Sequence, residues 1–335
     1  MLIQALIVAS AALVSLQTDC PPYPVTRGGI NCEIMWPTGA IGRVTDGVVA
    51  DDGFGAFSVL AVNGQTLDMP YKCEPNQCFI PIPHDNGYTV FAPPVPFPPK
   101  QGAAVPPLLQ VSRKIFLRTD TQVAPKDYIR YFDRIDNLTD QPMTVDVAFS
   151  GVLAAADAAQ IVNRGGGWAF IKGDVQAAKP FIGLIFDFSR ESENKPIAFT
   201  YINGRLCVVY HLTVKPYSSV GLLNFVVLTW TPMTTSPATE PRLAPAEITT
   251  ESIPDLLAQP DTSNLTPEEK SITWNFIDTD VNMDGRVNVI DLILVRNDLG
   301  NTPKTAQNPR ADCNHDFRIN IIDMIIVRND LGWPF

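Results

Sequence analysis

The chain has 335 residues, of which 45% are hydrophobic, so it is long enough to bury a sizeable core and to form two domains. Its 35 acidic and 25 basic residues give a net charge of −10. No cluster of Lys and Arg supplies a basic footprint, which argues against nucleic acid as a partner.

The chain begins with a mostly apolar run over residues 2–16, followed by polar Gln17, Thr18 and Asp19. The run is too short for a comfortable membrane span, so it predicts a secretory signal peptide over residues 1–18. We expect a secreted, extracellular or surface-associated protein with no membrane span once the signal is removed. A buried first strand or a membrane anchor are the alternatives.

Six cysteines in an exported chain favour disulfides, and six cysteines allow 15 connectivities. Cys73 and Cys78 bracket a short turn and form the first candidate pair, and Cys20 with Cys32 forms the next. Cys207 lies in a strand-like run, which predicts a buried thiol.

Residues 19–232 are dominated by short β-branched and aromatic runs separated by Pro, Gly, Asn and Asp, such as FSVLAV, YIRYFDRI and VGLLNFVVLTW. Asn63-Gly64 and Asn203-Gly204 supply the positive φ angles that type I′ hairpin turns need. These features predict one antiparallel β-sandwich domain of roughly eight to eleven strands.

Three segments of this domain are predicted separately. The proline-rich residues 92–107 are expected to cross between sheets outside any central strand, because each proline removes a ladder donor. Residues 153–162 read as a short helix. The motifs I-D-N-L-T from Ile135 and T-V-D-V from Thr144 resemble the Ig-like accessory modules of secreted bacterial proteins over some 20 residues.

No catalytic residues are assigned in the β domain. The sequence contains no G-x-S-x-G, no H-E-x-x-H and no phosphate loop. A glycoside hydrolase needs a carboxylate pair, and six acidic residues are candidates for one. They are Asp133, Asp136, Asp146, Asp187, Glu191 and Glu193.

Exposed aromatic rings would let a noncatalytic sandwich bind polysaccharide, and the candidates are Trp36, Tyr88, Tyr131 and Trp168. Three hypotheses for the β domain therefore stay open. It is a noncatalytic module, which we favour, or a carbohydrate-active hydrolase of an unfamiliar family, or part of a structural extracellular protein whose C-terminal segment only closes on the β domain and binds no partner.

Residues 233–264 are rich in Pro, Thr, Ser and Ala, which predicts an extended linker between the β domain and a C-terminal domain over residues 265–335. Thr266, Pro267 and Glu269 then read as the N-cap, N1 and N3 positions of a helix. We expect Trp274 and Phe276 to pack against the terminal residues 333–335 and to hold the two ends of this domain together.

The C-terminal domain contains a repeat of 32 residues, DVNMDGRVNVIDLILVRNDLG from Asp280 and DCNHDFRINIIDMIIVRNDLG from Asp312. Calcium takes six to eight oxygen ligands, and a 12-residue loop supplies them from positions 1, 3, 5, 7, 9 and 12. These positions are Asp280, Asn282, Asp284, Arg286, Asn288 and Asp291 in the first copy and Asp312, Asn314, Asp316, Arg318, Asn320 and Asp323 in the second.

The two arginines are compatible with this pattern because position 7 donates only its backbone carbonyl. Position 6 needs a sharp turn, which Gly285 makes without steric cost and Phe317 makes poorly. We therefore expect two calcium ions, the second bound more weakly. Residues 265–335 carry 11 acidic and 7 basic residues, a net charge of −4, so the fold of this domain should depend on the metal.

Both loops end in Asp and lead directly into a helix ending V-R-N-D-L-G, and in this the repeat resembles the type I dockerin domain. The resemblance implies a calcium-dependent, three-helix module that binds a cohesin-type domain, typically in extracellular polysaccharide degradation. It also implies which positions contact the cohesin. They are Val289, Ile290, Arg296, Asn297, Ile321, Ile322, Arg328 and Asn329.

Overall fold

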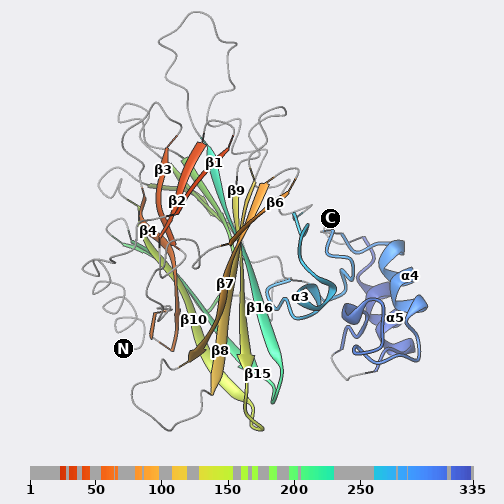
Figure 1. Cartoon of the computed structure of the whole chain (residues 1–335). Helices are drawn as coiled ribbons and strands as arrows, with labels where there is room; N and C mark the ends of the chain where they lie inside the picture. Colours follow the sequence, from red (N-terminus) through yellow and green to blue (C-terminus); the bar gives the residue numbers. More distant parts are fainter. Residues whose placement is uncertain are drawn as a thin grey trace, which may run out of the picture.

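The computed structural model confirms a β-dominated chain with a small helical C-terminal region (Figure 1). It describes residues 23–27, 30–35, 40–45, 54–63, 65–66, 80–84, 87–97, 108–118, 128–153, 160–164, 168–172, 181–186, 196–202, 205–229, 260–276, 278–284, 286–314 and 318–332. The predicted signal peptide and most of the predicted linker lie outside these residues.

Two eight-stranded sheets, with every strand pair antiparallel, form the β domain. Sheet 1 has the order β1-β2-β3-β4-β10-β15-β14, with β5 paired to β4. Its strands are β1 (Tyr23–Arg27), β2 (Ile30–Met35), β3 (Ala40–Thr45), β4 (Phe54–Val62), β5 (Gln65–Thr66), β10 (Met143–Leu153), β14 (Ala198–Ile202) and β15 (Arg205–Val214).

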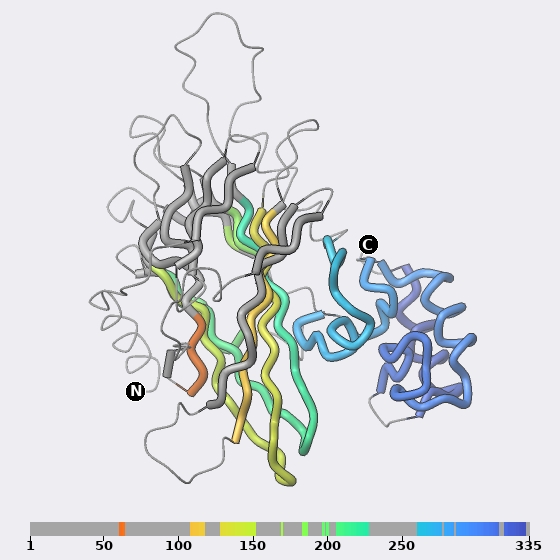
Figure 2. Tube along the Cα trace, in the orientation of Figure 1, coloured from red at the N-terminus to blue at the C-terminus, as the bar shows by residue number. Residues whose placement is uncertain are grey.

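Sheet 2 has the order β11-β12-β13-β16-β9-β8-β7-β6. Its strands are β6 (Ile80–His84), β7 (Gly87–Phe97), β8 (Leu109–Arg118), β9 (Tyr128–Asn137), β11 (Gln160–Arg164), β12 (Trp168–Lys172), β13 (Phe181–Ile185) and β16 (Ser219–Thr229). In the tube of Figure 2, the long strands β8, β9, β10, β15 and β16 appear in colours from yellow to green.

The inner faces of the two sheets meet in a core that contains polar as well as apolar groups. Tyr210 of sheet 1 donates its hydroxyl to Oδ1 of Asn224 in sheet 2 at 3.1 Å. Arg113 and Asp133, cross-strand partners in sheet 2, form a fully buried ion pair with an Nε to Oδ1 distance of 2.6 Å. The Arg113 guanidinium lies 4.6 Å from the centre of the Tyr131 ring.

The hairpins predicted at the two Asn-Gly dipeptides are confirmed by the strand pairing. β4 pairs with β5 through Val62 and Gln65, and Asn63 has a φ of 49°. β14 pairs with β15 through Ile202 and Arg205, which leaves a two-residue connection.

Three predictions for the β domain were wrong. The described residues form sixteen strands, more than the eleven expected, because many strands are short. Residues 92–97 belong to β7, where a register shift between Ala92 and Val95 accommodates Pro93 and Pro94. β6 pairs only with Gly87 to Phe91 of β7, so these prolines face no β6 donor or acceptor. Residues 160–162 lie in β11, not in a helix.

The C-terminal region contains α3 (Pro267–Ser271), α4 (Val289–Asn297), a 3₁₀ turn η2 (Pro309–Ala311) and α5 (Ile321–Asn329). The predicted capping box of α3 is confirmed, since Thr266 accepts from the Glu269 N–H and the Glu269 side chain accepts from the Thr266 N–H. Gly300 and Gly332, three residues beyond the ends of α4 and α5, have φ angles of 86° and 92°.

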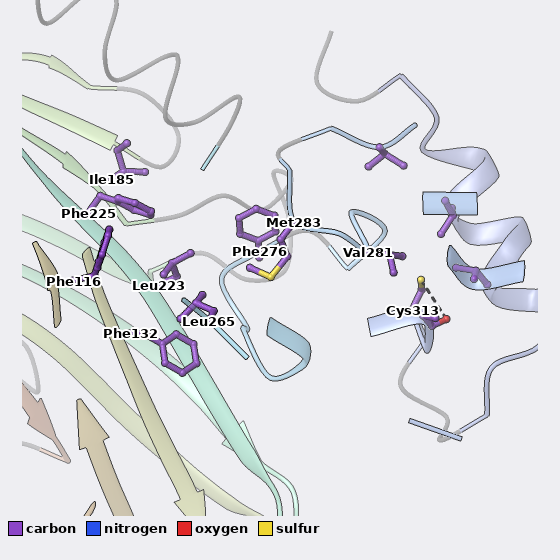
Figure 3. Packing of buried hydrophobic residues seen from close by; sticks show 14 of the residues in the cluster. Phe116, Phe132, Ile185, Leu223, Phe225, Leu265, Phe276, Val281, Met283 and Cys313 are labelled. Carbon is purple, nitrogen blue, oxygen red and sulfur yellow. Dashed lines mark hydrogen bonds between the residues drawn. The ribbon is translucent and has the colours of Figure 1, made fainter. Parts of the chain in front are cut away.

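The C-terminal region packs on the outer face of sheet 2. One hydrophobic cluster joins Phe116, Phe132 and Leu223 of the sheet to Leu265 and Phe276. Figure 3 shows that the cluster continues from these side chains through Met283 and Val281 to Cys313 near the helices. The two domains therefore share one core.

The side chains of two of the six cysteines, Cys207 and Cys313, are described, and both are free thiols buried among apolar groups. Cys207 was predicted to be a buried thiol, and burial raises its pKa to about 11. Burial also raises the pKa of Cys313. Both thiols are therefore protonated at neutral pH. The predicted pairs Cys73 with Cys78 and Cys20 with Cys32 lie outside the described side chains.

Candidate functional site

The first candidate calcium loop is organised by hydrogen bonds from its own backbone to its acidic side chains. The Asp284 N–H donates to Oδ1 of Asp280 at 3.1 Å and to Oδ1 of Asn282 at 2.9 Å. The Arg286 N–H donates to Oδ1 of Asp284 at 2.9 Å. These bonds place the side chains of loop positions 1, 3 and 5 along one turn of chain.

Asp291, at loop position 12, closes the first loop onto α4. Its Oδ1 accepts from the N–H groups of Val281 and Asn282, and its Oδ2 accepts from the N–H of Asn288 at 2.8 Å. Asn288 in turn caps α4 by accepting from the Ile290 N–H. The carboxylate of position 12 is therefore held at the start of the helix by both ends of the loop.

The chemistry of this loop fits a calcium ion. Asp280 and Asp291 are both 0% exposed, although each carries a carboxylate. Burial raises the pKa of Asp291, and the charge of Asp284 acts in the same direction, against the backbone hydrogen bonds. A hard divalent cation would relieve both effects.

The donor set is mixed, not purely acidic. Within the described ranges, no three His, Cys, Asp or Glu side chains converge as a metal site. The predicted ligands instead combine carboxylates with the amide oxygens of Asn282 and Asn288 and the carbonyl of Arg286, the oxygen mixture that calcium accepts.

The described part of the second loop repeats this arrangement. Asp323 is fully buried, and its carboxylate accepts from the N–H groups of Asn314 at 3.3 Å and Asn320 at 2.8 Å. Asn320 caps α5 by accepting from the Ile322 N–H. Asp316 and Phe317 of this loop, and Gly285 of the first, lie outside the described residues.

The two copies are joined crosswise at their helix ends. The Gly300 N–H, after α4, donates to the carbonyl of Ile319 in the second loop at 2.9 Å. The Gly332 N–H, after α5, donates to the carbonyl of Val287 in the first loop at 2.8 Å. Each loop is thus braced by the helix of the other copy.

The residues predicted to contact a partner lie on exposed parts of α4 and α5. Val289 and Ile321 are 63% and 61% exposed, and Ile290 and Ile322 are 49% and 51% exposed. Arg296, Asn297, Arg328 and Asn329 are also exposed. The structure therefore gives both copies matching surfaces.

The candidate catalytic carboxylates are not brought together. Asp133 points into the sandwich and pairs with Arg113, and burial raises its pKa while Arg113 lowers it. Asp136 lies on the other face of β9 and pairs with Arg134, and Asp146 of sheet 1 pairs with His211 at 2.7 Å. Asp187, Glu191 and Glu193 lie outside the described residues.

Tyr131 is 0% exposed, so the prediction that its ring offers a polysaccharide surface was wrong. Its position in β9 turns it toward the inter-sheet core. The side chains of Trp36, Tyr88 and Trp168 lie outside the described set.

The aromatic residues that precede the first loop contact the β domain. The Trp274 ring meets the Tyr210 ring edge-on, with 6.2 Å between centroids. Phe276 lies in the shared core, with the Arg310 guanidinium 5.7 Å from its ring centre. Residues 333–335, their predicted partners, lie outside the described residues. The partners of Trp274 and Phe276 on the β domain escaped sequence reasoning because no local pattern marks them.

Paired loop-and-helix units with buried position-12 carboxylates define a calcium-binding repeat domain. The family model of the dockerin type I domain matches residues 278–332. The C-terminal segment is therefore a type I dockerin domain, and calcium binding follows from that family. No curated protein matches the chain. No helix within the described ranges is long and apolar enough to cross a membrane.

Several solved structures show a distant likeness of fold, each with a TM-score below 0.4. A candidate kojibiose phosphorylase from the human microbiome has 10% identity and a TM-score of 0.39, with 74% of this chain and 34% of that chain covered. The Slr1438 protein from Synechocystis sp. PCC 6803 has 12% identity and a TM-score of 0.39, covering 65% and 99%. Heparan sulfate lyase HepC from Pedobacter heparinus has 10% identity and a TM-score of 0.36, covering 68% and 42%. This chain therefore spans about a third of the phosphorylase.

Proposed function

We propose that this is a secreted protein whose dockerin domain binds a cohesin-type domain in the presence of calcium. The domain would attach a noncatalytic β-sandwich to an assembly engaged in extracellular polysaccharide degradation or to a cell surface. The observation that carries the proposal is the doubled apolar surface on α4 and α5.

This surface consists of four matching pairs of large exposed side chains. They are Val289 and Ile321, Ile290 and Ile322, Ile293 and Ile325, and Leu299 and Leu331. The exposed positions correspond between the two helices, and exposed apolar groups rimmed by polar residues are typical of a protein-binding surface. Arg296 and Arg328 supply the polar rim.

Two calcium ions are proposed, one in each loop. The ligands would be the six loop positions named for each copy, with Arg286 and Arg318 contributing backbone carbonyls. Each ion would neutralise a buried position-12 carboxylate, Asp291 or Asp323. Loading both loops would then fix the starts of α4 and α5, and with them the apolar surface.

The experiment is a binding assay between the full chain and a panel of recombinant type I cohesin domains, in calcium and in chelator. We expect binding to at least one cohesin in calcium and its loss in chelator. The double variant Ile290→Asp with Ile322→Asp should lose binding at least 100-fold, since buried interface anchors cost about 2–4 kcal/mol or more each.

Leu138→Asp is the matched control, because Leu138 is 42% exposed but belongs to the β domain. This variant should bind cohesin as the unchanged chain does. Full binding by the double variant, or no calcium-dependent binding to any member of the panel, would contradict the proposal.

A further inference from the structure

Residues 260–276, here called the strap, complete an open edge of sheet 2. β13 ends at Ile185, opposite Phe225, so the next residues of β16 have no β13 partner. The Gly221 N–H donates to the Ile272 carbonyl at 2.7 Å, and the Trp274 N–H donates to the Gly221 carbonyl at 2.8 Å. The strap therefore continues the sheet where β13 stops.

Asn275 extends the same edge with its side chain. Its Oδ1 accepts from the Leu223 N–H at 2.8 Å, and its Nδ2 donates to the Leu223 carbonyl at 2.7 Å. Nδ2 also donates to the Phe186 carbonyl at 3.0 Å. One buried amide thus takes the place of a strand partner for Leu223.

The first half of the strap carries acidic groups that meet basic groups on β8 and β9. Lys114 donates to Glu269 at 2.9 Å, and Arg134 lies 3.0 Å from Glu268. The buried guanidinium of Arg130 donates to the carbonyls of Asp261 and Ser263 at 2.5 and 2.6 Å. Burial lowers the pKa of Arg130, and the Asp261 carboxylate acts against this effect.

Arg310 connects the strap to the first calcium loop. It belongs to η2, between the two loops, and is 6% exposed. Its Nη1 donates to the carbonyls of Lys270 at 2.9 Å and Thr273 at 3.3 Å, both in the strap. Its Nε donates to the carbonyl of Asp280, the first residue of the loop, at 3.3 Å.

Apolar contacts also connect the strap with the first calcium loop and with sheet 2. Leu265 and Phe276 of the strap lie in one cluster with Met283 and Val287 of the loop and with Phe132 and Leu223 of sheet 2. Figure 3 shows Phe276 beside Met283, between the sheet and the loop. Met283 has a positive φ of 57°, a conformation that the folded loop imposes.

We propose that calcium binding in the first loop and attachment of the strap to sheet 2 are coupled through Arg310 and this shared core. The inference rests on the calcium binding proposed above. Without the cation, the buried charges of Asp280 and Asp291 would oppose the closed loop, and opening it would move the Asp280 carbonyl and Met283. The strap would then lose contacts that hold it on the β16 edge.

Hydrogen exchange at Gly221 and Leu223 tests the coupling on the full chain. Both N–H groups donate to the strap and neither donates to β9, so their protection reports on strap attachment. We expect their exchange in chelator to be about 5- to 150-fold faster than in calcium, the usual range for coupled sites. Amides of β10 in sheet 1 serve as the internal control and should change little.

Arg310→Gln should remove the response, so that exchange at Gly221 and Leu223 differs little between calcium and chelator. Arg296→Gln, at an exposed position of α4, is the matched control and should respond as the unchanged chain does. If Arg310→Gln fails to fold, Asn275→Ala provides the second test. It lies outside the calcium loop, yet by reciprocity it should weaken calcium binding by a similar factor in calorimetry.

Three outcomes count against the coupling. Equal exchange in calcium and chelator, in a chain that binds calcium by calorimetry, would overturn the coupling and leave the calcium site intact. If calorimetry detects no heat of calcium binding, both the coupling and the calcium dependence in the proposed function would be overturned. Unchanged calcium affinity in Asn275→Ala would also overturn the coupling.

Discussion

Gly221 is required by Phe132, its diagonal neighbour on β9, which lies opposite Leu223. A Cβ atom at this position would lie 2.5 Å from Cζ of Phe132, far inside contact distance. The ring covers the glycine because Phe132 belongs to the core shared with the strap. The Gly221 N–H donates to the Ile272 carbonyl, and the Gly221 carbonyl accepts from the Trp274 N–H, so the backbone of Gly221 must remain accessible to the strap.

Gly221→Ala should therefore lower the free energy of unfolding by about 1–3 kcal/mol, the usual cost of overpacking. Denaturant unfolding of the full chain measures this change. Because the clash involves the tip of the Phe132 ring, the double variant with Phe132→Leu should recover part of the loss beyond additivity. Strict additivity of the two changes would contradict this explanation.

At the scale of elements, the calcium loops and their helices could be predicted because their determinants are local. The spacing of oxygen side chains, the Asn caps and the position-12 carboxylates all lie within 12 residues of each other. The strap could not be predicted, because Asn275 bonds Leu223, 52 residues away in sequence. Its partner groups are available only because β13 ends early, which no local pattern reveals.

The two loops should differ in calcium affinity, because Gly285 and Phe317 occupy the same turn position. If that turn needs a positive φ, a residue with a Cβ costs about 1–2 kcal/mol, or roughly 5- to 30-fold in affinity. Calorimetry on the full chain should resolve a tight and a weak site, and Phe317→Gly should tighten the weak one. Gly285→Phe is the reverse control, and two equal sites in the unchanged chain would refute the prediction.

At the scale of the whole molecule, the strap makes the β domain and the dockerin domain parts of one folded body. The predicted linker reaches residue 264, yet Asp261, Ser263 and Asn264 already contact Arg130 and Lys114 of the sheet. In Figure 1, α3 lies between sheet 2 and the helices α4 and α5. The apolar side chains of α4 and α5 remain exposed, while Phe116, Phe132 and Leu223 on the outer face of sheet 2 are covered.

In a chain ending at residue 259, the β domain should consequently be less stable than it is in the full chain. It would expose Phe132, Leu223 and Phe225 of the shared core, together with the open edge of β16, which favours association between sheets. We expect a lower unfolding temperature than in the full chain and self-association in size-exclusion chromatography. A synthetic peptide of residues 260–276, added at millimolar concentration, should reverse part of both effects, because it restores the edge contacts. The same peptide with Asn275→Ala should restore less of the unfolding temperature and less of the monomeric state. A truncated chain that is as stable and as monomeric as the full chain would contradict the structural role of the strap.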